Sequence, residues 1–233
     1  MSDDGNTDEL EDLEPILVQV KSGDPIGAAY RLVQLAGTGS PGRFFYDAGS
    51  IALSRRDELG DDALRFARIA FAEAVEREPD LAEAHHDLAT TMRELGMAED
   101  AILHYRRSLE LLPNDADSMI GLGASQCDAG RVDEAVLSLR KAAGTHPDSG
   151  QAFANLGIAL EAAGRDEEAV GAYAKAVARF DAALAEATDD EHATEAAARR
   201  RWTRIQHACL LERLARWPQA IVEIRRVFEE EQA

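Results

Sequence analysis

Residues 116–149 and residues 150–183 decide the fold. They read ADSMIGLGASQCDAGRVDEAVLSLRKAAGTHPDS and GQAFANLGIALEAAGRDEEAVGAYAKAVARFDAA. Aligned without a gap, both stretches have a Leu-Gly pair, then a glycine, and then two alanines at the same offsets. The chain therefore repeats itself at an interval of 34 residues, by subtraction of the residue numbers.

The same interval extends towards the N-terminus and recurs in several columns. Four columns hold small or apolar residues, and a fifth holds proline near the end of each unit. The columns are Leu88, Leu122, Leu156; Ala67, Ala101, Ala135, Ala169; Phe71, Tyr105, Leu139, Tyr173; Ala74, Ser108, Ala142, Ala176; and Pro79, Pro113, Pro147. Agreement of this kind at one period indicates a repeat architecture.

Each column has a physical reason in a pair of antiparallel helices. Small residues let two helices approach closely, and a bulky residue fills the space between neighbouring pairs. A glycine in the left-handed conformation ends the first helix, and a proline stops the second one. One hairpin cannot bury its apolar side alone, so neighbouring hairpins must stack. The sequence therefore predicts an all-α fold of stacked antiparallel helical hairpins.

The repeat resembles the tetratricopeptide repeat (TPR), whose 34-residue signature has these residue types in these places. The clearest units are 82–115, 116–149 and 150–183, with Leu88-Ala89, Leu122-Gly123 and Leu156-Gly157 at the paired positions. The resemblance covers most of the chain. It implies a right-handed α-solenoid in which the first helix of each hairpin lines a groove for a protein or peptide.

The weaker flanking units complete the expected organisation. We expect a disordered acidic tail over 1–14, a degenerate capping hairpin over 15–42, and a first repeat over 43–81. In that first repeat Ile51-Ala52 takes the paired positions, and the turn from Ser54 to Asp61 is about three residues too long. Residues 184–233 are expected to form a long helix and a C-terminal capping hairpin, with a turn at 188–190.

Composition narrows the class of partner. The chain has 233 residues and a formal net charge of −19, which repels nucleic acid. No window approaches the roughly 18 apolar residues of a membrane span, and the acidic N-terminus does not resemble a signal peptide. The two cysteines have no metal-like or redox-like spacing. We therefore expect a cytoplasmic protein whose partner is another protein or peptide, without nucleic acid or a membrane.

The TPR resemblance also implies which side chains face the groove. Carried onto this sequence, the partner-binding positions are Arg56, His86, Thr90, Arg93, Ile120, Ala124, Asn155, Ile158, Trp202 and Ile205. The clamp of basic residues and asparagines with which co-chaperones of the family grip an acidic chaperone tail is missing, and only Asn155 matches it. Our hypothesis is an extended or helical ligand with apolar anchors, orientated by Arg56, Arg93 and Asn155. The alternative is that these side chains only pack between repeats.

No pattern indicates catalysis, a cofactor or a metal site. His85 and His86 are adjacent and cannot point the same way on a helix, and the other histidines are scattered. The acidic pairs, such as Asp133-Glu134, recur in every repeat at the start of a helix, where they favour its dipole. Gly121-Leu122-Gly123 lies inside a predicted helix and is therefore not a nucleotide-binding loop.

The sequence thus predicts a non-catalytic adaptor or chaperone-like scaffold. Two alternatives stay open: an accessory or regulatory subunit docked on an enzyme through the region from Trp202 to Trp217, and a small-molecule binder or enzyme that uses the groove. A further possibility is that the acidic tail folds over Arg56 and Arg93 and competes with ligands.

Overall fold

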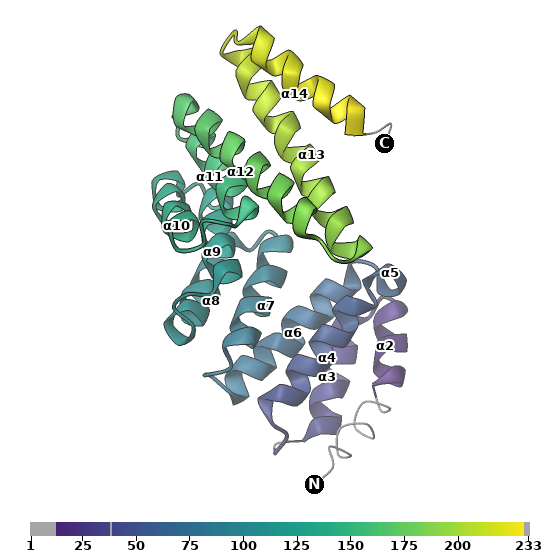
Figure 1. The fold of residues 1–233 in the computed structure, drawn as a ribbon. Helices are drawn as coiled ribbons and strands as arrows, with labels where there is room; N and C mark the ends of the chain where they lie inside the picture. The colour runs from purple at the N-terminus through teal and green to yellow at the C-terminus, as the bar shows by residue number, and fades with distance from the viewer. Residues whose placement is uncertain (1–12, 38, 231–233) are drawn as a thin grey trace. The chain divides into compact units, whose positions relative to one another are not determined.

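The computed structural model describes residues 13–37 and 39–230, and within these ranges every regular element is a helix (Figure 1). The prediction of an all-α fold built from helical hairpins is confirmed. The chain forms two compact units, Met1–Ser118 and Met119–Ala233. In the described ranges no helix is long and apolar enough to cross a membrane.

The first unit contains three helical hairpins, and most of its helices pair in chain order. Its helices are α2 (Glu14–Lys21), α3 (Pro25–Ala36), α4 (Gly42–Ser54), α5 (Arg56–Leu59), α6 (Asp62–Arg77), α7 (Ala82–Glu94) and α8 (Ala98–Leu111). The next helix, α9 (Ala116–Asp128), contains the junction between the units. The second unit continues with α10 (Val132–Thr145), α11 (Gly150–Ala162), α12 (Asp166–Glu186), α13 (Asp190–Arg213) and α14 (Trp217–Glu230).

The N-terminal hairpin begins two residues earlier than we expected. Leu13 is buried and α2 starts at Glu14, although both residues were assigned to the acidic tail. Pro15 is tolerated because the first turn of a helix does not use its missing N–H. The Glu14 carboxylate lies 2.7 Å from the Arg55 guanidinium, which ties α2 to the following hairpin. Residues 1–12, the rest of the expected tail, lie outside the described residues.

The two helices of a hairpin approach closely where a glycine faces a bulky side chain. A Cβ added at Gly157 on α11 would lie 2.6 Å from Tyr173 Cε1 on α12, well inside the 3.5–4 Å of a favourable carbon contact. A Cβ at Gly49 on α4 would lie equally close to Phe71 Cε1 on α6. Tyr173 and Phe71 are both buried. The paired helices can therefore approach this closely only because glycine has no side chain at these positions.

This contact corrects the register of the first repeat. We placed Ile51-Ala52 at the paired positions, but the structure puts Gly49 against Phe71, ahead of the expected pair. The difference arises because the long turn contains an extra helical turn, α5, between α4 and α6. As a result Arg56 lies on α5 and not on the first helix of a hairpin.

The C-terminal hairpin follows the expected turn. Helix α12 ends at Glu186 and α13 begins at Asp190, where the Asp189 carboxylate accepts a hydrogen bond from the His192 amide at 2.9 Å. The turn between α13 and α14 closes like the one between α11 and α12. The Arg216 amide donates to the Leu211 carbonyl, as the Arg165 amide does to the Leu160 carbonyl, both at 2.8 Å.

The Gly157 contact leads to a stability prediction. Gly157→Ala should lower the free energy of unfolding by about 1–3 kcal/mol because its methyl group overlaps the Tyr173 ring. Gly171 on α12 is the matched control, since a Cβ there meets nothing within 4 Å. Gly171→Ala should instead raise the free energy of unfolding by roughly 0.5–1 kcal/mol through the entropy of the unfolded chain. Urea denaturation followed by circular dichroism measures both, and equal effects would contradict the packing argument.

A second prediction concerns Ala215, which has a φ of 57°. Gly164 has the equivalent place in the turn between α11 and α12, with a φ of 69°. Because a left-handed backbone costs an L-residue roughly 1–2 kcal/mol, Ala215→Gly should raise the free energy of unfolding by about 1 kcal/mol. Gly164→Ala should lower it by a similar amount. Thermal and urea unfolding of the two variants test this, and stabilisation by Gly164→Ala is the outcome that contradicts it.

Candidate functional site

A trough between α11 and α13 is the best-formed candidate site, and it lies within the second unit. Its inner hollow has a volume of about 440 Å³. Helix α11 contributes Gln151, Ala154, Asn155 and Ile158, which are spaced so that they share one face of the helix. Helix α13 contributes Ala198, Arg199, Trp202 and Thr203. The structure thus brings three of the predicted groove residues, Asn155, Ile158 and Trp202, into one hollow.

The polar side of the inner hollow is a short chain of hydrogen bonds. The Gln151 amide nitrogen donates to Asn155 Oδ1 at 3.2 Å, and Arg199 Nη1 donates to Gln151 Oε1 at 3.0 Å. The described residues supply no acceptor for the Asn155 NH₂ group. That group therefore keeps its capacity to donate to a carbonyl of a bound chain.

The apolar side of the inner hollow is formed by Ala154, Ile158 and Trp202. Ala154 is buried, Ile158 is half-buried, and 44% of the Trp202 surface is exposed. A large, partly exposed aromatic ring beside aliphatic side chains provides contact area for an apolar group at a low cost in conformational entropy.

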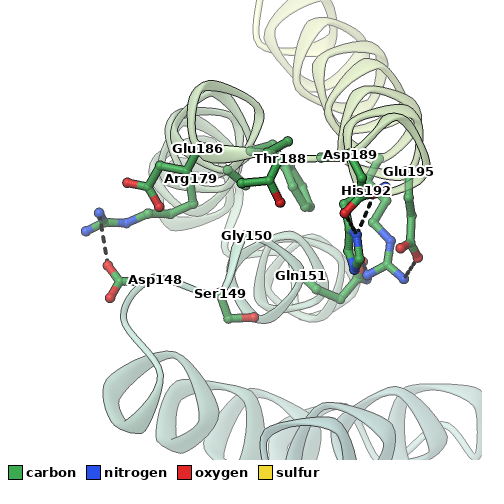
Figure 2. Close-up of a pocket in the computed structure, with 15 residues that line it drawn as sticks. Asp148, Ser149, Gly150, Gln151, Arg179, Glu186, Thr188, Asp189, His192 and Glu195 are labelled. Atoms are coloured by element: carbon green, nitrogen blue, oxygen red, sulfur yellow. Dashed lines mark hydrogen bonds and ion pairs between the residues drawn. The ribbon is translucent and has the colours of Figure 1, made fainter.

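An outer hollow of about 520 Å³ adjoins the inner one and shares Gln151 and Arg199 with it. Figure 2 shows this hollow, with the start of α11 on one side and the end of α12 and the start of α13 on the other. Its charged groups are largely paired. Arg179 lies 3.3 Å from Asp148, Arg199 pairs with Glu195, and the His192 ring lies 2.7 Å from Asp189. Glu186 adds one more carboxylate to the lining.

The pairing of His192 with Asp189 shifts the pKa of both side chains. The hydrogen bond from the ring to the carboxylate raises the pKa of His192 above its usual value. Hydrogen bonds from the His192 backbone amide and from its ring lower the pKa of Asp189. The pair therefore stays ionised over a wider range of pH than either group alone, and the outer hollow keeps its mixture of both charges.

In the first unit, His86 lies in a smaller hollow of about 230 Å³ together with Glu83, Asp87, Asp115 and Tyr46. His86 Nδ1 is 2.8 Å from the Ser118 hydroxyl oxygen and 3.8 Å from an Asp115 carboxylate oxygen. Burial, and then the neighbouring Asp87 charge, raise the pKa of Tyr46 to about 12. This predicted groove position is thus surrounded by acidic groups.

The other predicted groove residues of the first unit do not join that hollow. Arg56 on α5 lies 2.7 Å from Glu94 and 3.7 Å from Asp61, so its charge is already engaged. Thr90 is 2.8 Å from the Tyr105 hydroxyl, oxygen to oxygen. Arg93 is half-buried. The structure therefore brings His86, Thr90 and Arg93 together around Tyr105, whose ring centroid lies 5.6 Å from that of His86. Arg56 on α5 does not belong to this group, because acidic residues already engage it.

Three more predicted groove residues lie in the second unit but outside the trough. Only 8% of the Ile120 surface is exposed, so this side chain serves packing, as the alternative interpretation had it. Ala124 is half-buried and Ile205 is 40% exposed, and neither lines the inner or the outer hollow.

The residue that sequence reasoning missed is Arg199. The groove positions that the TPR resemblance implies do not include Arg199, yet Arg199 connects α13 to α11 and lines both hollows. One signal was available. Arg199 precedes Trp202 by three residues and therefore shares its helix face.

One of the histidines that we regarded as scattered, His104, is in contact with His85. His85 on α7 and His104 on α8 stack with ring centroids 5.3 Å apart, and their Nδ1 atoms are 3.0 Å apart. His85 Nε2 is 3.1 Å from the Pro79 carbonyl oxygen, which can only accept. In the neutral pair His85 Nδ1 therefore accepts the hydrogen bond and His104 Nδ1 donates it. Burial lowers the pKa of both rings.

This pair makes the stability of the protein depend on pH. Because the folded state lowers the pKa of His85 and His104, the unfolded chain binds more protons below about pH 6.5, the usual pKa of histidine. Stability is then fully present above that pH and falls as the solution is acidified through it. His104→Gln should make the free energy of unfolding fall less steeply between neutral and mildly acidic pH.

His192→Gln is the control for this titration. The folded state raises the pKa of His192, so its contribution is present at low pH and is lost as the pH rises. Removing it should make the loss of stability on acidification steeper. Urea denaturation at a series of pH values measures both slopes. A steeper loss in His104→Gln would show that the buried pair does not control the effect.

No protein-family model matches the sequence, and no curated protein matches it. Several solved structures have a similar fold. MamA from Desulfovibrio magneticus RS-1, in a form that begins at residue 41, is 18% identical over 84% of this chain and 98% of its own, with a TM-score of 0.63. YrrB, described as a TPR protein with an unusual peptide-binding site, is 19% identical over 81% of this chain and 93% of its own, with a TM-score of 0.56.

TTC0263, a thermophilic TPR protein from Thermus thermophilus, gives the same identity and TM-score as YrrB over 81% of this chain and 90% of its own. At these identities the likeness concerns the fold. Together with the 34-residue repeat and the glycine contacts between paired helices, it shows that this chain has the fold of the tetratricopeptide repeat proteins, an α-solenoid of stacked helical hairpins.

Proposed function

We propose that this chain is a non-catalytic scaffold that binds a segment of another protein, and that the trough between α11 and α13 is its binding site. The observation that carries the proposal is the composition of the inner hollow. An exposed tryptophan and an aliphatic wall lie beside side-chain amides on an open surface. Such a site offers contact area and hydrogen bonds, which are what an extended chain requires.

The side chains of the trough define the kind of segment that fits. The Asn155 NH₂ group donates to a main-chain carbonyl of the ligand, while an apolar ligand side chain contacts Ile158 and Trp202. In the outer hollow Glu186 adds a carboxylate to the paired charges, and the whole chain carries a net charge of −19. A ligand with a basic residue near its apolar anchor is therefore favoured over an acidic one.

Two further points support a protein ligand. The net charge disfavours nucleic acid, and YrrB, which has the same fold, is described as having a peptide-binding site. The trough contains only part of the groove that we predicted. It uses Asn155, Ile158 and Trp202 from that prediction and adds Arg199. We keep the cytoplasm as the expected location.

The two tryptophans of the chain make a matched pair for testing the site. Trp202 lines the inner hollow, whereas Trp217 lies at the start of α14 and is similarly exposed. We expect peptides selected from a random-sequence display library to bind the intact chain. Trp202→Ala should then weaken the selected peptide roughly thirtyfold, the effect of losing a contact of about 2 kcal/mol. Trp217→Ala should leave the affinity unchanged.

Titration of a fluorescein-labelled peptide, followed by fluorescence polarisation, measures these affinities. In the Trp217→Phe background Trp202 is the only tryptophan, so a change in its emission on binding reports contact at the trough. Asn155→Ala should weaken binding about fivefold through the loss of one hydrogen bond of about 1 kcal/mol. The proposal is wrong if no peptide is selected, or if Trp202→Ala and Trp217→Ala affect affinity equally.

A further inference from the structure

The last helix, α14, has an apolar stripe that the described chain does not cover. Trp217, Ile221, Ile224 and Phe228 are spaced by four, three and four residues, so they lie on one face of the helix. Between 43% and 59% of the surface of each is exposed. Large apolar side chains that are exposed singly are ordinary, but four of them in one row mark an interaction surface.

The repeat itself shows what covers such a stripe. Ile221, Ile224 and Phe228 each lie 85 residues after Val136, Leu139 and Ala143 of α10, so the two sets have the same positions in their hairpins. The residues of α10 are at most 6% exposed. Leu139 lies against Gly123 on α9, the first helix of its own hairpin, and α10 also packs against α11, the first helix of the next hairpin. In the same register, α14 therefore presents a surface on which the first helix of a further hairpin can pack.

The opposite end of the chain has the complementary feature. Val18 on α2 is 58% exposed. Val18 lies ten residues before Ala28, the small residue of the second helix in its hairpin. The residues at the same position in later hairpins are Thr91, Ser125, Ala159 and Leu210. Thr91, Ser125 and Leu210 are at most 1% exposed, and Ala159 is fully buried. Val18 is exposed where its counterparts are buried, because in the described residues no hairpin packs against this side of α2.

The two ends also carry opposite charge. Residues 199–233 contain five acidic residues, Glu212, Glu223, Glu229, Glu230 and Glu231, against eight arginines, at 199, 200, 201, 204, 213, 216, 225 and 226. Several of these arginines also pair within the second unit, such as Arg204 with Asp181 and Arg216 with Glu167. Residues 1–30 contain a single basic residue, Lys21, against eight acidic ones, at 3, 4, 8, 9, 11, 12, 14 and 24. In a chain with a net charge of −19, contact between these two ends is the arrangement that brings unlike charges together.

From these observations we propose that copies of this chain associate head to tail, with α2 of one copy packed on the α14 stripe of the next. The contact continues the stacking of hairpins from one molecule into another. It uses two different surfaces, so each pair of copies keeps one free surface of each kind and further copies can add. Because only one hairpin end contributes on each side, we expect association that depends on protein concentration.

Sedimentation velocity over a range of protein concentrations tests the proposal. The unaltered chain should form species larger than a dimer as its concentration rises. Val18→Glu and Ile224→Glu should each abolish them, because a buried unpaired carboxylate is costly. The control is Leu137→Glu, at a side chain that is 68% exposed but lies on α10, away from both ends of the chain. It should associate like the unaltered chain.

A mixture of the two end variants separates head-to-tail contact from other arrangements. Val18→Glu keeps its α14 stripe and Ile224→Glu keeps its α2 surface, so an equimolar mixture should form a dimer and nothing larger. A monomeric unaltered chain, a mixture that stays monomeric, or loss of association in Ile224→Glu alone would each overturn the proposal. Circular dichroism establishes that each variant is folded. Peptide binding at the trough should be unchanged, so this test is independent of the proposed function.

Discussion

The closest approach of the two helices in each hairpin is the constraint on which the structure depends. At Gly157 the α11 backbone lies against the Tyr173 ring of α12, and at Gly49 the α4 backbone lies against the Phe71 ring of α6. These contacts set how near the paired helices come and which face each helix turns outward. On α11 the face with Gly157 is turned to its partner helix, and this leaves Asn155 and Ile158 for the trough. The packing inside one hairpin thus determines which side chains line the trough.

The trough also depends on a second level of order, the contact between one hairpin and the next. Arg199 on α13 reaches Gln151 on α11, and Arg213 pairs with Glu161 at 2.8 Å further along the same two helices. Both bonds connect first helices of successive hairpins. The Arg199–Gln151 bond lies where the inner and outer hollows meet, and the Arg213–Glu161 pair lies beyond the residues that line them. Surface ion pairs contribute little to stability one at a time. Here they connect α11 with α13, the two helices that form the trough.

Polar groups inside the hairpins are arranged in a way that contrasts with the trough. His85 and His104 satisfy each other and the Pro79 carbonyl in the packed interior between α7 and α8, so this polar pair serves the fold. Gln151 and Asn155 use only part of their hydrogen-bonding capacity at an open surface. The two polar groups thus differ in how much of their hydrogen-bonding capacity the fold itself uses.

The sequence by itself determined the hairpin fold, because the small and bulky residues that allow close helix packing must recur with the length of a hairpin. It also predicted individual wall residues such as Asn155 and Trp202, since their positions follow from helix periodicity. The tertiary structure decided which predicted positions are exposed and which distant residues meet, because neither follows from helix periodicity. The inserted turn α5 moved the register of the first repeat and removed Arg56 from the wall, and Ile120 became buried by its neighbours. Arg199 joined the site from a helix 48 residues away from Gln151, because such contacts depend on how hairpins stack and not on the order of residues within one of them.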